Sequence, residues 1–478
     1  MVEKLRDILS RLDLNGREES VRRVVKENLP HFGHLEPKDQ IIAIYFIQTM
    51  DITSYEKSAE EIARLQTTGE RHTGEKTLLQ ESTGKFIDHI SLDDNIIGLV
   101  RIAFPLQNVW DAKHDTIYST EILHIVAGAV QFDFPKNIDI KLVHLYLPQQ
   151  VIDAFPGPAF GPGGLRKLAK YGQKIAFGTI GKPKTGLTPE EYAPVIAEAA
   201  KNPLFLFVKD DENFGVWYGP CPLDKRVKAV SESIKRANKE RGEGEIIYAP
   251  HIGNAVQNLI GNAGTALDNG ATAIMFSEIY GRGGVRMVRD HLAKTGRSVP
   301  IYGHNGGITP LTKAVYREIL DMLARLDGID LRQTGPVGTH KIPLLRPYGD
   351  EWVASELALM GELGKHKPVM IARAGGLDQG NIILNLDDIT ERGYNQSNFL
   401  MLAGSAINEW RNPEGKYDPK GGAEAMQQAI NAYDIDGFDA LPKETHIQRL
   451  YEHAKAKGYK ELVAALEQRY KEMQLGGR

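Results

Sequence analysis

Two adjacent carboxylates, Asp211 and Glu212, stand close to a lysine in the segment Lys209-Asp210-Asp211-Glu212. Mg²⁺ prefers oxygen ligands and usually takes one or two protein carboxylates while keeping room for water or substrate. We therefore take Asp211 and Glu212 as candidate Mg²⁺ ligands. Lys209 would normally pair with them, but a carbamate formed from CO2 on its amine would supply a third anionic oxygen. The alternative is a solvated charged turn.

Two more cations, Lys182 and Lys184, flank Pro183 earlier in the chain. Alternate residues of an extended segment point the same way, so both ammonium groups could reach one anion. A lysine held close to other cations or in an apolar environment has a lowered pKa and can serve as a base. Both lysines are therefore candidate catalytic residues, and a pair of surface lysines after a strand is the alternative.

Small residues suggest a place for a phosphate. Gly375-Gly376 and Gly404-Ser405 each follow a strand-like run. Backbone N–H groups in such turns commonly bind phosphate in barrel enzymes. Paired glycines also mark ordinary turns, so the two pairs carry more weight together than apart.

Histidines add candidate proton carriers. His304 lies at the end of a strand-like run and is a candidate acid–base group, with a hydrogen-bonded structural role as the equal alternative. His251 and His340 are weaker candidates.

The elements that must position these residues alternate along the second half of the chain. Eight short apolar runs are separated by segments of helical composition, which predicts a (β/α)8 barrel. An open doubly wound sheet could show the same alternation, but we find no clear dinucleotide-binding fingerprint. Barrel enzymes place their active site at the carboxyl ends of the strands, where the candidate residues fall. The predicted strands are 174–180, 205–210, 245–251, 273–279, 299–305, 328–334, 369–376 and 399–405.

The first part of the chain has a different pattern. A charged, helix-like extension covers residues 1–35, and a mixture of strand-like and helical runs predicts an α+β, ferredoxin-like domain over 36–152. A segment rich in Gly and Pro then marks the crossing into the barrel. We expect the barrel domain to span 153–440 and a helical tail to span 441–478.

Composition excludes several classes of protein. The chain has 478 residues with a net charge of −4, and without a basic cluster it is not expected to bind nucleic acid. Cys221 is the only cysteine, which rules out an intrachain disulfide and a Cys-based zinc site and fits a reducing cytoplasm. The charged N-terminus is unlike a signal peptide, and no early apolar run is long enough to span a membrane. We expect a cytoplasmic protein.

Taken together, these motifs resemble the large subunit of ribulose-1,5-bisphosphate carboxylase/oxygenase (RuBisCO) and its RuBisCO-like relatives. The resemblance covers residues of about 40 to 440. It is carried by Gly178-Thr179-Ile180-Gly181-Lys182-Pro183-Lys184-Thr185-Gly186-Leu187, by Val208-Lys209-Asp210-Asp211-Glu212-Asn213 and by Pro156-Gly157-Pro158-Ala159-Phe160-Gly161.

The resemblance implies a metal centre and a base. Lys209 looks like the lysine that CO2 carbamylates, with Asp211 and Glu212 as the accompanying Mg²⁺ ligands. Lys182 resembles the lysine that helps to abstract a proton next to the substrate carbonyl, and Lys184 resembles its companion.

The rest of the resemblance concerns the substrate and the assembly. His304 matches the histidine on the fifth strand, and Gly375, Gly376 and Gly404 fall where the family binds a substrate phosphate. The family also implies a homodimer in which one subunit's N-terminal domain covers the barrel mouth of the other.

Departures from the family pattern limit the expected activity. The histidine on the fifth strand is followed by a phosphate-binding arginine in the family, and Asn305 stands there in this chain. The loop after the sixth strand, residues 333–341, has no convincing equivalent of the lysine that steadies CO2, although Lys341 is nearby. An arginine binds phosphate through a bidentate cationic fork, so Asn305 would be a weaker substrate contact.

The sequence thus favours a RuBisCO-like protein (form IV). We expect a Mg²⁺-dependent lyase or isomerase that forms an enolate or enediolate from a small, phosphorylated keto-sugar or keto-acid. The outcome would be isomerisation, tautomerisation or decarboxylation. The alternatives are a divergent but genuine ribulose-1,5-bisphosphate carboxylase and a catalytically silent scaffold.

Overall fold

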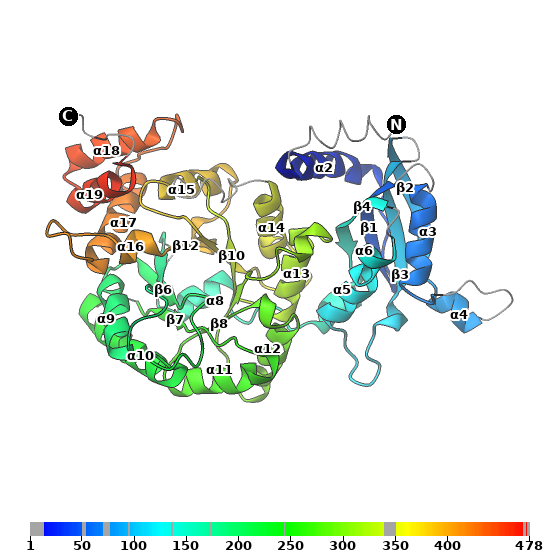
Figure 1. Cartoon of the computed structure of the whole chain (residues 1–478), viewed down its shortest axis with the longest axis horizontal. Helices are drawn as coiled ribbons and strands as arrows, with labels where there is room; N and C mark the ends of the chain where they lie inside the picture. The colour runs from blue at the N-terminus through cyan, green and yellow to red at the C-terminus, as the bar shows by residue number, and fades with distance from the viewer. Residues whose placement is uncertain are drawn as a thin grey trace.

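The computed structural model describes residues 14–49, 54–69, 77–93, 96–134, 137–172, 174–242, 244–338, 350–471 and 475. Its strands form two separate sheets, one antiparallel and one parallel. Figure 1 shows the parallel sheet with its surrounding helices on one side of the molecule and the antiparallel sheet on the other. No helix in the described parts of the chain is long and apolar enough to cross a membrane.

The parallel sheet has eight strands in the order β7-β6-β5-β12-β11-β10-β9-β8. A parallel bridge between His251 and Met275 joins the two end strands and closes the sheet into a barrel. The (β/α)8 barrel predicted from the sequence is therefore confirmed. The strands are β5 (Phe177–Ile180), β6 (Phe205–Lys209), β7 (Ile247–Ala249), β8 (Ile274–Ser277), β9 (Ile301–His304), β10 (Leu331–Thr334), β11 (Met370–Ala374) and β12 (Phe399–Ala403).

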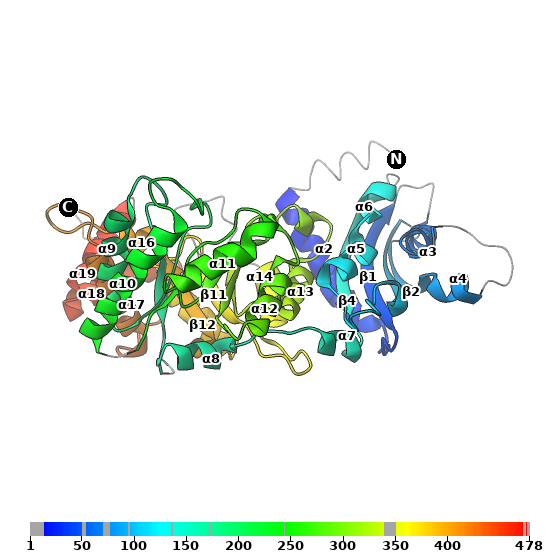
Figure 2. The same ribbon diagram turned by 90° about the horizontal axis from the view of Figure 1, so that it is seen from below.

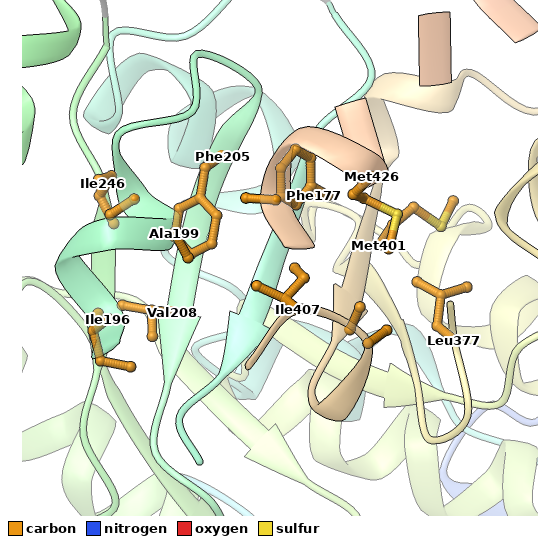
Figure 3. Close-up of a cluster of buried hydrophobic side chains, with 14 of the residues drawn as sticks. Phe177, Ile196, Ala199, Phe205, Val208, Ile246, Leu377, Met401, Ile407 and Met426 are labelled. Carbon is orange, nitrogen blue, oxygen red and sulfur yellow. The ribbon is translucent and has the colours of Figure 1, made fainter. Parts of the chain in front are cut away.

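These strands are apolar on both faces because the barrel buries both. Along β12, Phe399, Met401 and Ala403 pack in the cluster beneath the helices. Leu400 and Leu402 pack in a second cluster with inward residues of the other strands. Alternate residues of a strand point to opposite faces, which is why a continuous apolar run suits a barrel wall. Figure 3 shows part of the outer cluster, including Phe177, Ile196, Phe205, Met401 and Met426.

One helix precedes the first barrel strand, and the others lie after the strands in sequence. The helix after β5, α9, begins at a capping box, in which Thr188 and Glu191 bond to each other's backbone N–H groups, with Pro189 in the first turn. The helices are α8 (Gly161–Leu168), α9 (Pro189–Ala200), α10 (Leu223–Arg241), η3 (Val256–Asn258), α11 (Leu259–Asp268), η4 (Glu278–Tyr280), α12 (Gly284–Lys294), η5 (Leu311–Lys313), α13 (Arg317–Asp327), α14 (Asp350–Met360), α15 (Ile382–Glu391), η6 (Gln396–Asn398), α16 (Ser405–Asn408) and α17 (Pro419–Asp434). Two tail helices, α18 (His446–Lys457) and α19 (Lys460–Arg469), contact α17.

The antiparallel sheet has four strands in the order β2-β3-β1-β4. Along the chain the order of elements is β-α-β-β-α-β, which is the ferredoxin-like arrangement expected from the sequence. The strands are β1 (Gln40–Thr49), β2 (Lys85–Asp93), β3 (Ile97–Pro105) and β4 (Asn137–Tyr146). The helices of this part are α2 (Leu14–Asn28), η1 (Leu29–His31), α3 (Tyr55–Leu65), α4 (Thr77–Ser82), η2 (Leu106–Asn108), α5 (Ser119–Ala127), α6 (Val130–Asp133) and α7 (Gln149–Ala154).

The barrel helix α13 joins the two parts of the molecule (Figure 2). Ile319, Leu320 and Leu323 of this helix belong to the same buried cluster as the antiparallel sheet. Just before the helix, the backbone of Leu142 in β4 exchanges hydrogen bonds with Ala314 and Tyr316. The domain boundaries given above at residues 35, 152 and 440 stay predictions.

Candidate active site at the barrel mouth

The candidate residues lie at or just beyond the carboxyl ends of the barrel strands. Lys209 is the last residue of β6 and His304 the last residue of β9. Lys182 follows β5 by two positions, and Asp211 and Glu212 follow β6. Because all eight strands are parallel, these ends meet at one rim of the barrel.

Lys209 is fully buried beneath this rim. Its Nζ lies 3.1 Å from the carbonyl oxygen of Asp210 and 3.4 Å from Oε2 of Glu212. It also lies 5.7 Å from the centre of the Tyr302 ring. Burial lowers the pKa of Lys209, and the nearby carboxylates of Glu212 and Asp211 oppose that shift. An amine whose pKa is lowered is more readily present in the neutral form, which is the form that reacts with CO2.

Lys182 forms an ion pair with Asp211. The lysine side chain is 30% exposed and the aspartate side chain 5%, so solvent reaches the pair mainly at the lysine. Asp211 also accepts a hydrogen bond of 3.0 Å from the N–H of Asn213. Burial raises the pKa of Asp211, but the hydrogen bonds from Lys182 and Asn213 outweigh it, so the pKa lies below the usual value.

His304 faces Glu212 with one ring nitrogen held by the backbone. Its Nδ1 accepts a hydrogen bond of 3.0 Å from the N–H of Gly306, so the proton of the neutral ring resides on Nε2. Nε2 lies 3.4 Å from Oε2 of Glu212 and has no hydrogen-bond partner among the described residues. Burial, and after it the charge on Lys209, lower the pKa of His304 to about 3. The ring is therefore a neutral donor at physiological pH.

Asp210 anchors the backbone between Lys209 and Asp211, a role that the sequence analysis missed. Its Oδ1 accepts hydrogen bonds from the hydroxyls of Tyr192 and Tyr248, at 3.2 and 3.1 Å. Its Oδ2 accepts from Nε of Arg226 at 2.9 Å and from the N–H of His251 at 3.1 Å. The alternation of the strand was the available signal, because it sends Asp210 away from its neighbours Lys209 and Asp211.

The two predicted glycine pairs also lie at the rim. Gly375 and Gly376 directly follow β11 with φ angles of +91° and +97°, a region that favours glycine. Gly404 lies beside the catalytic candidate Lys182: a Cβ placed on Gly404 would be 3.9 Å from Cε of Lys182. Ser405 begins the short helix α16 and is half-buried.

Two other predicted residues have different surroundings. The side-chain amide of Asn305 donates a hydrogen bond of 3.1 Å to the carbonyl oxygen of Gln333, which ties the end of β9 to β10. Lys184 is exposed and makes no hydrogen bond or ion pair with any described residue, so the structure does not bring it into the cluster. His340 and Lys341 lie outside the described residues.

His251, one of the weaker histidine candidates, lies just beyond the end of β7. It is fully buried, and its Nδ1 lies 2.9 Å from the carbonyl oxygen of Phe214, to which it must donate. Its Nε2 has no hydrogen-bond partner within the described ranges. Burial lowers the pKa of His251, so the neutral ring presents Nε2 as an acceptor.

The donor set fits Mg²⁺ on one condition. Across the parts of the chain that the structure describes, no group of three or more His, Cys, Asp or Glu side chains is arranged to hold a metal ion. Asp211 and Glu212 supply two carboxylates, and each of them contacts the ammonium group of a lysine. A carbamate on Lys209 would replace one of these cations with an anionic oxygen, which completes a ligand set of the kind that Mg²⁺ takes.

Comparisons with known proteins agree with this geometry. Residues 163–469 match the family model described as the ribulose bisphosphate carboxylase large chain, catalytic domain. The chain is 27% identical over 457 residues to the ribulose bisphosphate carboxylase of Thermococcus onnurineus, covering 90% of this chain and 94% of that one. It is 32% identical over 211 residues to the 3-oxo-isoapionate-4-phosphate transcarboxylase/hydrolase of Xanthobacter autotrophicus, covering 44% and 47% of the two chains.

The fold of the whole chain is shared with solved structures of the same family. The octameric ribulose-1,5-bisphosphate carboxylase/oxygenase of Pyrococcus horikoshii superposes with a TM-score of 0.76 at 22% identity, over 93% of this chain and 96% of that one. The family match includes all eight barrel strands and every strand end that carries a candidate residue. The Gly- and Pro-rich crossing before α8 lies outside it. This chain therefore belongs to the ribulose bisphosphate carboxylase large-chain family, and it resembles the RuBisCO-like members named from its motifs.

Proposed function

We propose that this protein is a Mg²⁺-dependent enzyme that forms an enolate or enediolate from a small, phosphorylated keto-sugar or keto-acid. The observation that carries the proposal is the cluster of Lys182, Lys209, Asp211, Glu212 and His304 at one rim of the barrel. It combines a candidate base, a candidate metal site and a neutral hydrogen-bond donor within a few ångströms.

Asp211, Glu212 and carbamylated Lys209 would hold the ion. When bound, Mg²⁺ polarises a carbonyl group and makes negative charge on its oxygen less costly. In this proposal Lys182 moves the proton at the carbon next to the substrate carbonyl. His304 donates from Nε2 toward the substrate oxygen, which its backbone-held tautomer allows.

The substrate would be anchored by its phosphate. The turns at Gly375-Gly376 and Gly404-Ser405 would bind that group through backbone N–H groups. A phosphate near Gly404 would lie beside Lys182, which brings the bound end of the substrate close to the base. Asn305, whose amide is engaged by Gln333, would contribute a contact without the charge of an arginine.

The nature of the substrate is supported by one relative. The Xanthobacter autotrophicus protein is named as a transcarboxylase/hydrolase of 3-oxo-isoapionate-4-phosphate, a keto-acid derivative that carries a phosphate. A carbon–carbon bond next to a carbonyl breaks through an enolate, as proton abstraction there also does. We therefore favour loss or transfer of a carboxyl group, or tautomerisation, in a sugar-derived substrate.

A second candidate function is the genuine carboxylase. It is favoured by the ribulose bisphosphate carboxylase of Thermococcus onnurineus, which matches over nine-tenths of this chain. Asn305 argues against the carboxylase function. Its amide is uncharged and donates to a carbonyl oxygen, so it cannot act as a cationic clamp for a second phosphate.

We also propose a homodimer. Apolar side chains are exposed on the loops that surround the mouth, with Trp217 52% and Ile279 68% exposed. A subunit interface over the mouth would cover these two side chains, which lie in the loops after β6 and β8. Light scattering coupled to gel filtration would give twice the mass of the chain or a multiple of that mass, and a monomer at micromolar concentration would contradict this proposal.

The experiment that tests the function is solvent exchange. A panel of phosphorylated keto-sugars and keto-acids, ribulose bisphosphate among them, would be incubated in D2O with Mg²⁺ and labelled bicarbonate and followed by NMR. Deuterium uptake or CO2 loss that Lys182→Ala and Lys209→Ala abolish, and that the surface control Lys201→Ala leaves intact, would support the proposal. Fixation of label into ribulose bisphosphate would favour the carboxylase, and exchange that survives both substitutions would refute the assigned roles.

A further inference from the structure

The segment directly after the Gly375-Gly376 turn is polar and yet buried. Asp378 is 3% exposed, and Gln379 and Asn381 are 0% exposed. Buried polar groups in native proteins are almost always hydrogen-bonded. The partners of these three side chains therefore show what the segment holds together.

Asn381 joins two loops of the barrel mouth. Its Nδ2 donates hydrogen bonds of 2.8 Å to the carbonyl oxygen of Gly376 and of 2.8 Å to that of Gly338. Gly376 belongs to the turn after β11, and Gly338 to the chain after β10. One turn along α15, Asn385 bonds to both the N–H and the carbonyl oxygen of Val337. The two asparagines thus fix the stem of the loop after β10 against the glycine turn.

Gln379 reaches a third element of the mouth. Its Nε2 donates a hydrogen bond of 2.8 Å to the carbonyl oxygen of Ala406 and one of 3.2 Å to that of Gly422. Ala406 follows Ser405 in α16, the helix that begins at the second predicted phosphate turn. The same short segment therefore bonds to the first turn and to the helix that begins at the second.

The C-terminal tail anchors this segment from behind. Oδ1 of Asp378 accepts hydrogen bonds from the N–H groups of Gly380 and Asn381, at 2.9 and 3.0 Å, and from the hydroxyl of Tyr470 at 2.7 Å. Tyr470 caps the last tail helix, α19, and is 4% exposed. A Cβ on Gly380 would overlap with the Tyr470 hydroxyl, so the ring packs directly on this backbone. Nε2 of His446 in α18 lies 3.2 Å from the carbonyl oxygen of Gly380.

A turn of two glycines needs such support if it is to bind an anion. Glycine loses more backbone freedom than any other residue when its conformation is fixed. Contacts that fix the turn beforehand reduce the cost of ordering it on binding. We propose that Asp378, Asn381 and Tyr470 are positioning residues, through which the C-terminal tail holds the Gly375-Gly376 turn in the conformation that binds the substrate phosphate. The phosphate part of this inference rests on the proposed function, whereas the mechanical part rests on the hydrogen bonds alone.

The experiment compares two tyrosine variants of the full-length protein. Tyr470→Phe removes the hydroxyl that bonds to Asp378 and keeps the ring over Gly380. The matched control is Tyr451→Phe, because Tyr451 lies in the same tail, is 3% exposed and donates its hydroxyl to Glu467 at 2.7 Å, away from the mouth. Asn381→Ser provides a second test of the same connection. Amide hydrogen exchange at residues 375–377 and titration with inorganic phosphate are the two measurements.

Tyr470→Phe loses one hydrogen bond to a buried group, so we expect exchange at residues 375–377 to become about tenfold faster. Asn381→Ser loses both bonds from Nδ2, to Gly376 and Gly338, so exchange there should become faster still. Phosphate should bind more weakly in both, while Tyr451→Phe matches the wild type in both measurements. Equal exchange at 375–377 in Tyr470→Phe and Tyr451→Phe would overturn the inference. If the wild type binds no phosphate, the phosphate site of the proposed function is wrong, and the exchange data alone decide whether the tail positions the turn.

Discussion

The carboxyl group of Asp327 should make the stability of this protein depend on pH. Asp327 ends α13, where that helix meets α5, and it is 3% exposed. Its Oδ2 accepts a hydrogen bond from the hydroxyl of Ser119, and its Oδ1 has no partner among the described residues. Burial raises the pKa of Asp327 to about 7, against the smaller opposing effects of Ser119, Arg282 and Arg286.

The sign of the effect follows from which state binds the proton. Between the unfolded pKa of 3.8 and the folded pKa of about 7, the folded protein keeps this proton and the unfolded chain does not. The resulting stabilisation is complete below the unfolded pKa and is lost as the pH rises through the folded pKa. Three pH units correspond to about 4 kcal/mol in total, of which about 3 kcal/mol is lost between pH 5 and pH 8.

Asp327→Asn isolates this contribution. The amide is neutral at every pH and its oxygen can still accept the hydrogen bond from Ser119. We expect the free energy of unfolding of the wild type, minus that of the variant, to fall by about 3 kcal/mol between pH 5 and pH 8. The variant should therefore be the more stable protein at pH 8, where the wild type buries a charged carboxylate.

Urea denaturation at several pH values, followed by tryptophan fluorescence, measures this difference. The other titrating groups cancel when the two proteins are compared at the same pH. Asp290→Asn is the control, because Asp290 lies in the neighbouring helix α12 with a 38% exposed side chain, paired with Arg286. A wild-type minus Asp327→Asn difference that stays constant with pH, or that grows as the pH rises, would refute the reasoning.

Three further predictions test the site and its support. Lys209→Met should remove a carbamate signal that ¹³C NMR detects in the wild type under labelled CO2, whereas Lys201→Met should retain it. Gly178→Ala should lower the melting temperature sharply or prevent folding, because the new Cβ would lie 2.2 Å from the carbonyl oxygen of Phe207 in the barrel wall. The control Gly163→Ala should melt like the wild type, because a Cβ there has no atom within 4 Å. Arg226→Met should destabilise the protein by about 3–5 kcal/mol in denaturant titrations, because it leaves the carboxyl of Asp210 buried without its cation; a loss below about 1 kcal/mol would show that the two tyrosine hydroxyls suffice.

The fold could be predicted from the sequence because the alternation of strand-like and helical segments is visible locally along the chain. Apolar runs of strand length recur between helical segments, and a barrel buries both faces of every strand, so the pattern is visible without tertiary information. The metal-site candidates were found for a similar reason, since Lys209, Asp211 and Glu212 lie within four consecutive positions.

The supporting residues could not be predicted because their partners are distant in the chain. Tyr470 and Asp378 are separated by 92 positions, and nothing near either residue indicates the other. Lys184 stays a predicted catalytic residue that the structure leaves exposed, because the local pattern around Pro183 does not indicate which partners the folded chain brings near. The role of Asn305 also depended on a partner, Gln333, that lies on another strand.

The attachment of α13 to the antiparallel sheet has a consequence for anyone who wishes to divide this protein. Ile308, Val315 and Tyr316 lie in the barrel half of the chain but are buried against the other half. A fragment cut near residue 152 would expose this apolar face and leave the backbone groups of Ala314 and Tyr316 without their partner Leu142. Such a fragment should aggregate when expressed alone. Chimeras with relatives would do better to exchange the antiparallel sheet together with the surface of α13, as a single graft.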